Sequence, residues 1–498
     1  MHENELHAKP DTTDVDVLIV GAGVSGVSVL IKLAERGVTN ALILDKAERI
    51  GGTWVANDYP GLRCDVPSEL YSLGFAPNPG WARTYSSQDE IRDYIESVAH
   101  SFGVVDRIRL RTEMVSAVWD EPARRWRITT ADGTEITAKV FVPAAGIIGE
   151  AKMPRLPGQE TFRGTVFHSG NWNHEHDLTG ERVAVVGAGA SAIQFLPAIQ
   201  PAVGKLYSFQ RAPSWVLSKP DFAMPRLVSR VFTRFPFVQR MIREAGFRGL
   251  EVMYPLMLHP RLLTTIVRPM QRSNMRRAIE DPELRRRLMP DHPFACKRPM
   301  LSNDWYPALA KPNVQVVFQG VERLTERGLV TTDGSEYEVD TVIFGTGYTA
   351  GDLAVTHIIR NGAGATINEV WNGSPRSYLG LAVHGFPNMF MMLAPNSQCH
   401  VQSVMWTSEL QAGYVARAVK ALLDGRVDRF EVKKSVHDGF VAAIDKRLER
   451  MPSQPKYCTT YFSDSTGRNH VVWPEWAFKI KRVLSRFAIT DYDIGATT

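Results

Sequence analysis

Cysteine is scarce in this chain of 498 residues, and the four cysteines that it has form no local pair. Cys64, Cys296, Cys399 and Cys458 are far apart in the sequence, and no CxxC motif occurs. This spacing argues against a disulfide framework and against a redox-active dithiol. We therefore expect a protein of the reducing cytoplasm without structural disulfides.

Long apolar runs are also missing. No stretch reaches the roughly 18 continuous apolar residues that a membrane span needs. Residues 1–16 are polar and acidic and lack the basic and apolar regions of a signal peptide, so we expect a short disordered lead-in. The sequence has neither an HExxH motif nor paired Cys and His ligands, and it has no separate GxSxG nucleophile motif. We therefore predict no metal site.

Positive charge is only in small excess, and the formal net charge is +5. Much of the excess lies between Arg226 and Arg287, and neither a nucleic-acid recognition motif nor an aromatic platform accompanies it. We predict no nucleic-acid partner and interpret these arginines as the solvated face of a helical insertion. The alternative is a peripheral membrane or partner-binding surface, and we do not expect membrane association.

Two loops share a similar spacing of glycines. Gly21-Ala22-Gly23-Val24-Ser25-Gly26 follows the apolar run 16–20, and Gly187-Ala188-Gly189-Ala190-Ser191-Ala192 follows the apolar run 182–186. Glycines at a strand–helix turn let the backbone approach a pyrophosphate, and the helix N-terminus adds N–H donors. We therefore predict an α/β protein with two Rossmann-like dinucleotide-binding domains. The alternative is a pair of tight turns without ligands.

The residue after the second strand of each unit distinguishes the two ligands. Asp45 lies 24 residues after Gly21, and Arg211 lies 24 residues after Gly187 (45 − 21 and 211 − 187). A carboxylate at this place binds ribose hydroxyls and repels a 2′-phosphate, whereas a guanidinium attracts one. The first site therefore suits FAD and the second NADPH. The alternative for Arg211 is an ordinary surface arginine.

The order of these segments predicts an FAD-binding domain interrupted by an NADPH-binding domain. We expect the FAD-binding domain at 1–150 and 344–498, and its second part includes the C-terminal region. We expect the NADPH-binding domain at 151–220 and 292–343, with the helical insertion at 221–291 between its two parts.

Two longer patterns then identify a family. Phe162, Gly164, His168 and Trp172 match the FxGxxxHxxxW pattern of the type I Baeyer–Villiger monooxygenases, which are class B flavin monooxygenases. A second pattern of that family is met by Gly51, Gly52, Trp54, Tyr59, Pro60, Gly61 and Asp65. The chain resembles this family from about residue 16 to residue 482.

The resemblance implies an enzyme that takes FAD and NADPH as cofactors and O2 and a small-molecule ketone (aryl, cyclic or aliphatic) as substrates. NADPH reduces the flavin, the flavin captures O2 as a C4a-peroxide, and one oxygen enters next to the ketone carbonyl to give an ester or lactone. Related flavin monooxygenases oxidise the nitrogen of amines or the sulfur of sulfides, and this activity is the alternative. We expect a monomer or a homodimer.

The resemblance also assigns roles to single residues. Arg298 matches the catalytic arginine, and Asp65 matches the carboxylate that holds it; the alternatives are a structural ion pair and a loop cap. His168 and Trp172 match a hinge that couples the two domains. His400 and Trp473 are candidates for the substrate pocket or for the core. The residues expected to bind the cofactors are Gly21, Gly23, Gly26, Asp45, Lys46, Gly52, Thr53, Trp54, Asp65, Tyr71, Gly187, Gly189, Ser191, Arg211, Lys297, Thr346 and Gly347.

Overall fold

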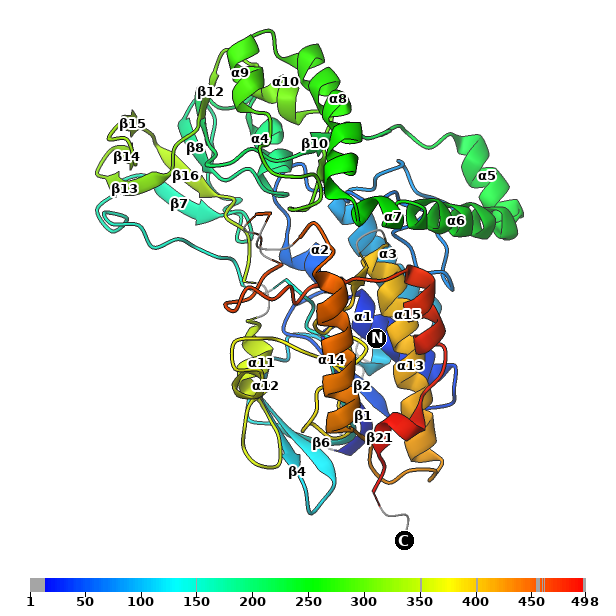
Figure 1. Ribbon diagram of the computed structural model, residues 1–498. Coiled ribbons are helices and arrows are strands. Elements are labelled where there is room, and N and C mark those ends of the chain that lie inside the picture. The colour runs from blue at the N-terminus through cyan, green and yellow to red at the C-terminus, as the bar shows by residue number, and fades with distance from the viewer. Residues whose placement is uncertain are drawn as a thin grey trace, which may run out of the picture.

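The computed structural model describes residues 14–148, 150–349, 352–399, 402–453, 457–458, 460 and 462–495. Of the expected lead-in, residues 1–13 lie outside this part of the chain, as does His400, whereas residues 14–16 belong to the first strand. Figure 1 shows two lobes, each built on its own sheet, with a group of helices that extends from one lobe across the edge of the other.

The first lobe is built on a seven-stranded sheet in the order β17-β4-β5-β6-β1-β2-β3. β1 runs parallel to β2 and β6, whereas β4, β5 and β6 form an antiparallel meander that the sequence analysis did not predict. The strands are β1 (Asp14–Val20), β2 (Ala41–Leu44), β3 (Ile108–Arg109), β4 (Met114–Asp120), β5 (Arg125–Thr130), β6 (Glu135–Pro143) and β17 (Ile359–Arg360). β2 is buried along its whole length because helices cover this part of the sheet.

Helix α1 (Val24–Ala34) lies in the core of this lobe. Its residues from Ser25 to Leu33 are buried except for Lys32, because α13 (Val404–Leu423) packs on the face that the sheet leaves free. The Ser25 and Ser408 hydroxyls are 2.9 Å apart at this contact. The C-terminal part of the chain therefore completes the first lobe, together with α14 (Lys434–Leu448), α15 (Ala477–Leu484) and the short pair β19 (Glu431–Val432) and β21 (Tyr492–Asp493).

Shorter elements connect these parts. They are α2 (Thr53–Ala56), α3 (Gln88–Ser101), η1 (Val105–Arg107), α11 (Ala354–Ile358), α12 (Ile367–Trp371), β18 (Gln398–Cys399), β20 (Val472–Trp473) and η2 (Ile489–Asp491).

The second lobe is built on a five-stranded parallel sheet in the order β12-β9-β8-β16-β7. Its strands are β7 (Thr165–His168), β8 (Arg182–Val186), β9 (Lys205–Phe209), β12 (Val314–Val317) and β16 (Thr341–Phe344), and it carries α4 (Ala192–Ile199) and α10 (Trp305–Leu309). A small antiparallel sheet of β13 (Val321–Thr325), β14 (Gly328–Thr331) and β15 (Glu336–Glu338) extends it. The predicted α/β class with two Rossmann-like sheets is confirmed.

Residues 221–291, all of which are described, hold helices and no strand. The helices are α5 (Arg226–Arg234), α6 (Pro236–Glu251), α7 (Tyr254–Met257), α8 (Pro260–Ala278) and α9 (Pro282–Arg287), and the parallel pair β10 (Val216–Leu217) and β11 (Met300–Leu301) flanks them. Within the described residues, no helix is both long and apolar enough to span a membrane. The domain boundaries drawn from the sequence remain predictions.

Candidate active site at the two nucleotide loops

The first glycine loop joins β1 to α1 and has no space for a side chain at Gly21 or Gly26. Gly21 has φ +115°, and a Cβ on it would lie 2.4 Å from the Ala144 carbonyl oxygen. A Cβ on Gly26 would lie 1.9 Å from the Gly21 carbonyl oxygen, and Gly23 faces Gly52 across the turn. The N-terminus of α1 has no side-chain cap. The first N–H groups of a helix lack intrahelical partners, so they can donate to a ligand. This arrangement fits a bound pyrophosphate.

Asp45 follows β2 and holds this loop in place. Its carboxylate accepts hydrogen bonds from Ala22 N–H at 2.5 Å and from Ala47 N–H at 2.8 Å. The residue therefore fixes the glycine loop to the end of β2, a role that the sequence analysis did not foresee. Its contact with a ribose stays a prediction, as does any role for the exposed Lys46.

Residues 52–71 lie beside the first loop. Gly52, with φ +59°, precedes Thr53 at the start of α2. The buried Trp54 donates from Nε1 to the Tyr71 hydroxyl at 3.2 Å, and the two rings meet edge to face at 5.6 Å. Burial raises the pKa of Tyr71, so its phenol stays protonated. The aromatic pair forms a rigid wall next to the loop.

The second glycine loop repeats this geometry between β8 and α4. Gly187 has φ +126°, and a Cβ on it would lie 2.3 Å from the Gly345 carbonyl oxygen. Ser191 occupies the N-cap position of α4, and its side chain does not cap the helix. Gly189 lies in the same turn, where an added Cβ would come no nearer than 4.0 Å to Gly345. The loop therefore leaves room for a phosphate ligand.

Arg211 stands two residues after β9, on the surface of the second lobe. Within the described part of the chain, no carboxylate lies within ion-pair distance of its guanidinium. Its side chain packs beside Gly320. An unpaired, exposed guanidinium at the end of the second strand fits the 2′-phosphate of NADP.

Arg298 and Asp65 form an ion pair between the two lobes. Arg298 Nη2 lies 2.7 Å from each carboxylate oxygen of Asp65, and the two side chains are 47% and 23% exposed. Asp65 comes from the loop after α2, whereas Arg298 and its partly buried neighbour Lys297 precede β11. The predicted pair of these two residues is therefore present in the geometry, and its catalytic role stays a prediction.

A second cation near this pair was missed in the sequence. The Lys219 side chain is 7% exposed, lies 3.7 Å from the Asp221 carboxylate and sits over the Tyr85 ring at 4.9 Å. Burial lowers the pKa of Lys219, and the negative charges of Asp221 and Asp65 oppose that shift. Only the fold shows that residue 219 lies close enough to Asp65 to feel its charge.

His168 ends β7 and is 2% exposed. Its Nδ1 accepts from the Gly170 N–H at 3.0 Å, so the neutral ring carries its proton on Nε2. Burial lowers the pKa of His168, and the Gly347 backbone partly offsets this shift. Nε2 is buried, and the Gly347 backbone is the polar group that acts on the ring. A neutral, buried ring of this kind suits a hinge better than a general base.

Trp172 and the 346–347 turn complete the joint between the lobes. The Trp172 ring packs against Phe167 and Phe195 at 5.1 and 5.4 Å, which places it in the core of the second lobe. The Thr346 hydroxyl donates to the Lys152 carbonyl at 2.7 Å, and Gly347 has φ +84°. The two chain crossings between the lobes are thereby bonded to each other.

Tyr59 and Gly61 make a contact that the pattern alone did not reveal. The Tyr59 hydroxyl donates to Gln194 Oε1 at 3.1 Å, and the Gln194 amide donates to the Arg63 carbonyl at 2.8 Å. Gly61 has φ +79°, and a Cβ on it would lie 2.7 Å from the Gln194 carbonyl oxygen. This loop of the first lobe therefore packs directly on α4, next to the second glycine loop.

The expectation of no structural disulfide is wrong. Cys296 and Cys458 form a disulfide between residues 162 positions apart. Local spacing gave no signal because only the tertiary fold brings these residues together. The bond links the segment that contains Lys297 and Arg298 to the C-terminal region. It removes the argument for a cytoplasmic location that rested on unpaired cysteines, and the cytoplasmic location stays a prediction.

No three His, Cys, Asp or Glu side chains of the described chain are grouped as metal ligands would be.

Comparisons with known proteins agree with this geometry. Residues 14–352 match the family model described as "Flavin-binding monooxygenase-like". The chain is 38% identical to a Baeyer–Villiger monooxygenase of Streptomyces coelicolor (96% of this chain, 92% of the relative) and 36% identical to one of Pseudomonas aeruginosa (97% and 92%).

Solved structures give the same result. The fold matches cyclohexanone monooxygenase from Rhodococcus sp. Phi1 bound to NADP+, with TM-score 0.85, 26% identity and coverage of 97% of this chain and 99% of the other. An oxidised steroid monooxygenase bound to NADP matches with the same four values. The chain belongs to the flavin-binding monooxygenase family, in its Baeyer–Villiger branch. The family agrees with the predicted flavin cofactor, and both of these structural neighbours were solved with bound NADP.

Proposed function

We propose that this enzyme inserts one atom of O2 next to the carbonyl of an apolar ketone, with FAD and NADPH as cofactors, and releases an ester or a lactone. The observation that carries the proposal is the Arg298–Asp65 pair, which joins the two lobes in a chain of the Baeyer–Villiger branch. FAD reduced by NADPH supplies the activated oxygen. The chain itself supplies binding, orientation and charge.

Arg298 would provide a fixed positive charge where negative charge develops on oxygen during the insertion. A guanidinium does not lose its proton at neutral pH, so its charge is constant through the reaction. Asp65 positions this charge by holding Nη2 with both carboxylate oxygens. A charge placed before the reaction starts stabilises developing negative charge without reorganisation.

Arg211 and Lys297 select NADPH in this proposal. Both are cations of the second lobe, and Lys297 stands next to Arg298 in the segment before β11. Attraction of the 2′-phosphate by these residues explains a preference for NADPH over NADH.

His168 and Trp172 couple cofactor binding to the chemistry. His168 is buried at the crossing between the lobes, where the Gly347 backbone acts on its ring. A bond formed there when the lobes close would exclude water from the site. His168 therefore acts as a positioning residue and transfers no proton to the substrate.

The direct test is a panel of apolar ketones and sulfides with the purified yellow protein. We expect esters or lactones from ketones, with a ratio of product to oxidised NADPH close to one. Sulfoxide formation without any ester would assign the chain to the heteroatom oxygenases instead. A colourless protein that does not bind NADPH would overturn the proposal.

A further inference from the structure

Helix α6 has one face that packs on the first lobe and one face that is open to solvent. On the inner face, Gln239 donates to Glu69 and to the Asn78 carbonyl, and Phe247 packs against Trp406 at 6.0 Å. Arg243 donates to the Ser72 carbonyl and to Glu409. These contacts hold α6 firmly on the first lobe, so its outer face has a defined orientation.

The outer face of α6 exposes large apolar side chains. Phe237, Met241 and Val252 are 59%, 65% and 71% exposed, and Phe235 and Ile242 beside them are also exposed. Phe237 and Met241 stand one turn apart on the helix. Soluble proteins rarely leave so many large apolar side chains together on one helix face.

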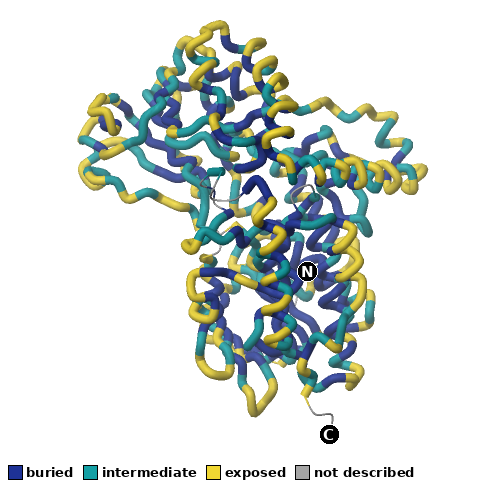
Figure 2. The backbone as a smooth tube through the Cα atoms, in the orientation of Figure 1, coloured by how far each residue is buried: buried dark blue, intermediate teal, exposed yellow. Residues whose placement is uncertain are grey.

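Helices α8 and α15 also expose large apolar side chains. Leu262, Ile266 and Met270 recur every four residues on α8 and are 52%, 49% and 58% exposed, while Leu263 and Val267 of the same helix are buried. At the end of α6, the Glu251 carboxylate accepts from the N–H of the exposed Phe478 at the start of α15. Figure 2 shows the exposed positions along this edge of the molecule.

Residues 222–278 are strongly basic, and we call them the basic arm. They contain eleven arginines, two glutamates and neither lysine nor aspartate, which gives a net charge of +9. The whole chain has a net charge of +5, so the remainder carries −4. Exposed arginines flank the apolar residues, with Arg240 and Arg248 on α6 and Arg261 and Arg272 on α8.

The positive charge and the exposed apolar side chains together indicate which kind of partner binds this face. A second copy of the arm would bring two surfaces of +9 together, and like charges repel. A nucleic acid matches the arginines but has no use for exposed phenylalanine, leucine and methionine side chains at helical spacing. An anionic bilayer matches both features, because phosphates face the arginines while acyl chains receive the apolar side chains.

We propose that the outer faces of α6 and α8 in the basic arm, together with the neighbouring start of α15, bind the surface of anionic lipid bilayers. The chain would lie on the interface without crossing it, in agreement with the absence of a spanning helix from the described residues. The proposal differs from the sequence-based expectations of a solvated arginine face and of no membrane association, and the experiment below decides between them. The inference does not depend on the ketone chemistry.

Vesicle sedimentation with the full-length holoenzyme tests the proposal. We expect binding to phosphatidylcholine vesicles that contain phosphatidylglycerol, little binding to pure phosphatidylcholine, and loss of binding at high salt. F237E/M241E should lower the partition coefficient about tenfold or more, because two apolar anchors are lost. R240E should lower it about 30-fold, because two charge steps act at the surface.

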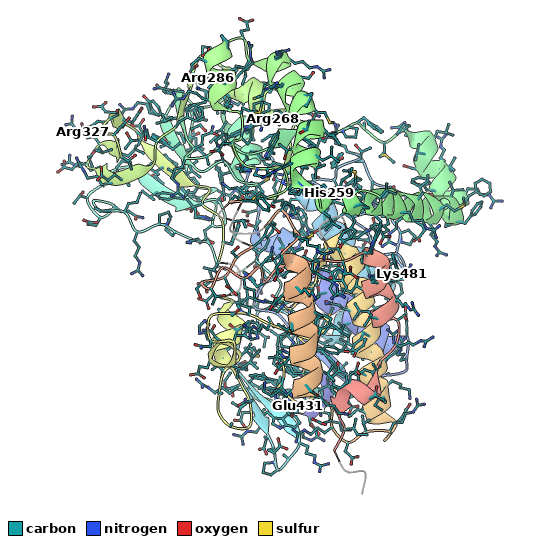
Figure 3. The ribbon with its side chains drawn as sticks, in the orientation of Figure 1. His259, Arg268, Arg286, Arg327, Glu431 and Lys481 are labelled. Carbon is teal, nitrogen blue, oxygen red and sulfur yellow. A yellow bond between two sulfur atoms is a disulfide. The ribbon has the colours of Figure 1, made fainter. Side chains whose placement is uncertain are left out.

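Matched controls keep the test specific. V115E and V370E change side chains that are 44% and 45% exposed on the first lobe, and R327E reverses a charge far from α6 (Figure 3). These variants should bind vesicles like the unchanged enzyme, and all variants should keep their flavin. Equal binding to neutral and anionic vesicles, or no binding, would overturn the proposal. Self-association of the enzyme that F237E/M241E abolishes would also overturn it, in favour of a second copy as the occupant.

Discussion

Replacing Asp65 with alanine tests how Arg298 is positioned. The change leaves the Arg298 guanidinium in place and removes both oxygens that hold Nη2 at 2.7 Å. Arg298 keeps its charge, so the variant changes orientation and not the chemical identity of the cation. We expect the loss to fall on oxygen transfer to the ketone.

The expected size follows from the exposure of the pair. Exposed ion pairs contribute about 0–1 kcal/mol, and hydrogen bonds to charged groups about 1.5–3 kcal/mol. Asp65 is 23% exposed and Arg298 47%, which places this pair between the two cases. A loss of about 1–2 kcal/mol of transition-state stabilisation corresponds to a fall of about 5- to 30-fold in the rate of ester formation.

The assay compares three quantities in the same reaction: NADPH oxidised, ester formed and hydrogen peroxide released. D65A should keep its KM for NADPH, form less ester and release more peroxide. D340A is the control, because it breaks a similarly exposed Arg–Asp pair, with Arg182, inside the second lobe. Unchanged coupling in D65A, or an equal loss in D340A, would refute the positioning role.

Three further predictions concern single residues. R211A should lower the preference for NADPH over NADH about 10- to 100-fold, measured as the ratio of kcat/KM values, since a charge-assisted phosphate contact is lost; an unchanged ratio would contradict the assignment. Burial lowers the pKa of His470 to about 4 from about 6.5, so the unfolded chain binds the proton more tightly. The free energy of unfolding should therefore be highest above about pH 6.5 and should fall by about 3 kcal/mol as the pH falls to about 4. Chemical denaturation of H470Q should show no such loss. Thiol titration of the denatured, unreduced protein should find two reactive thiols, and C458S should show three. In the chain-entropy model, C458S should also lose about 5 kcal/mol of unfolding free energy. Four thiols without reduction would rule the disulfide out.

The two glycine loops could be predicted because their constraint is local. Gly21 and Gly187 need a positive φ and lie close to the backbone just after the adjacent strand of the sheet. The spacing of glycines therefore predicts the geometry of each loop. The Arg298–Asp65 pair was reached only through resemblance to a family, since nothing in the spacing of residues 65 and 298 indicates contact.

Other features depend on the tertiary fold and have no local signal. The Cys296–Cys458 bond and the closeness of Lys219 to Asp65 arise when distant segments pack together. In α6 the helical period predicts apolar faces, but only the packing shows that the face with Phe247 is covered while the face with Met241 is open.

In the proposed reaction, O2 supplies the oxygen atom that enters next to the ketone carbonyl. The most direct measurement is the mass of the product made from an apolar cyclic ketone with NADPH under oxygen-18 gas. We expect a lactone with one atom of oxygen-18 in its ring and one carbonyl oxygen from the ketone. A product without the label, or an unchanged ketone with full NADPH oxidation for every ketone tested, would contradict it.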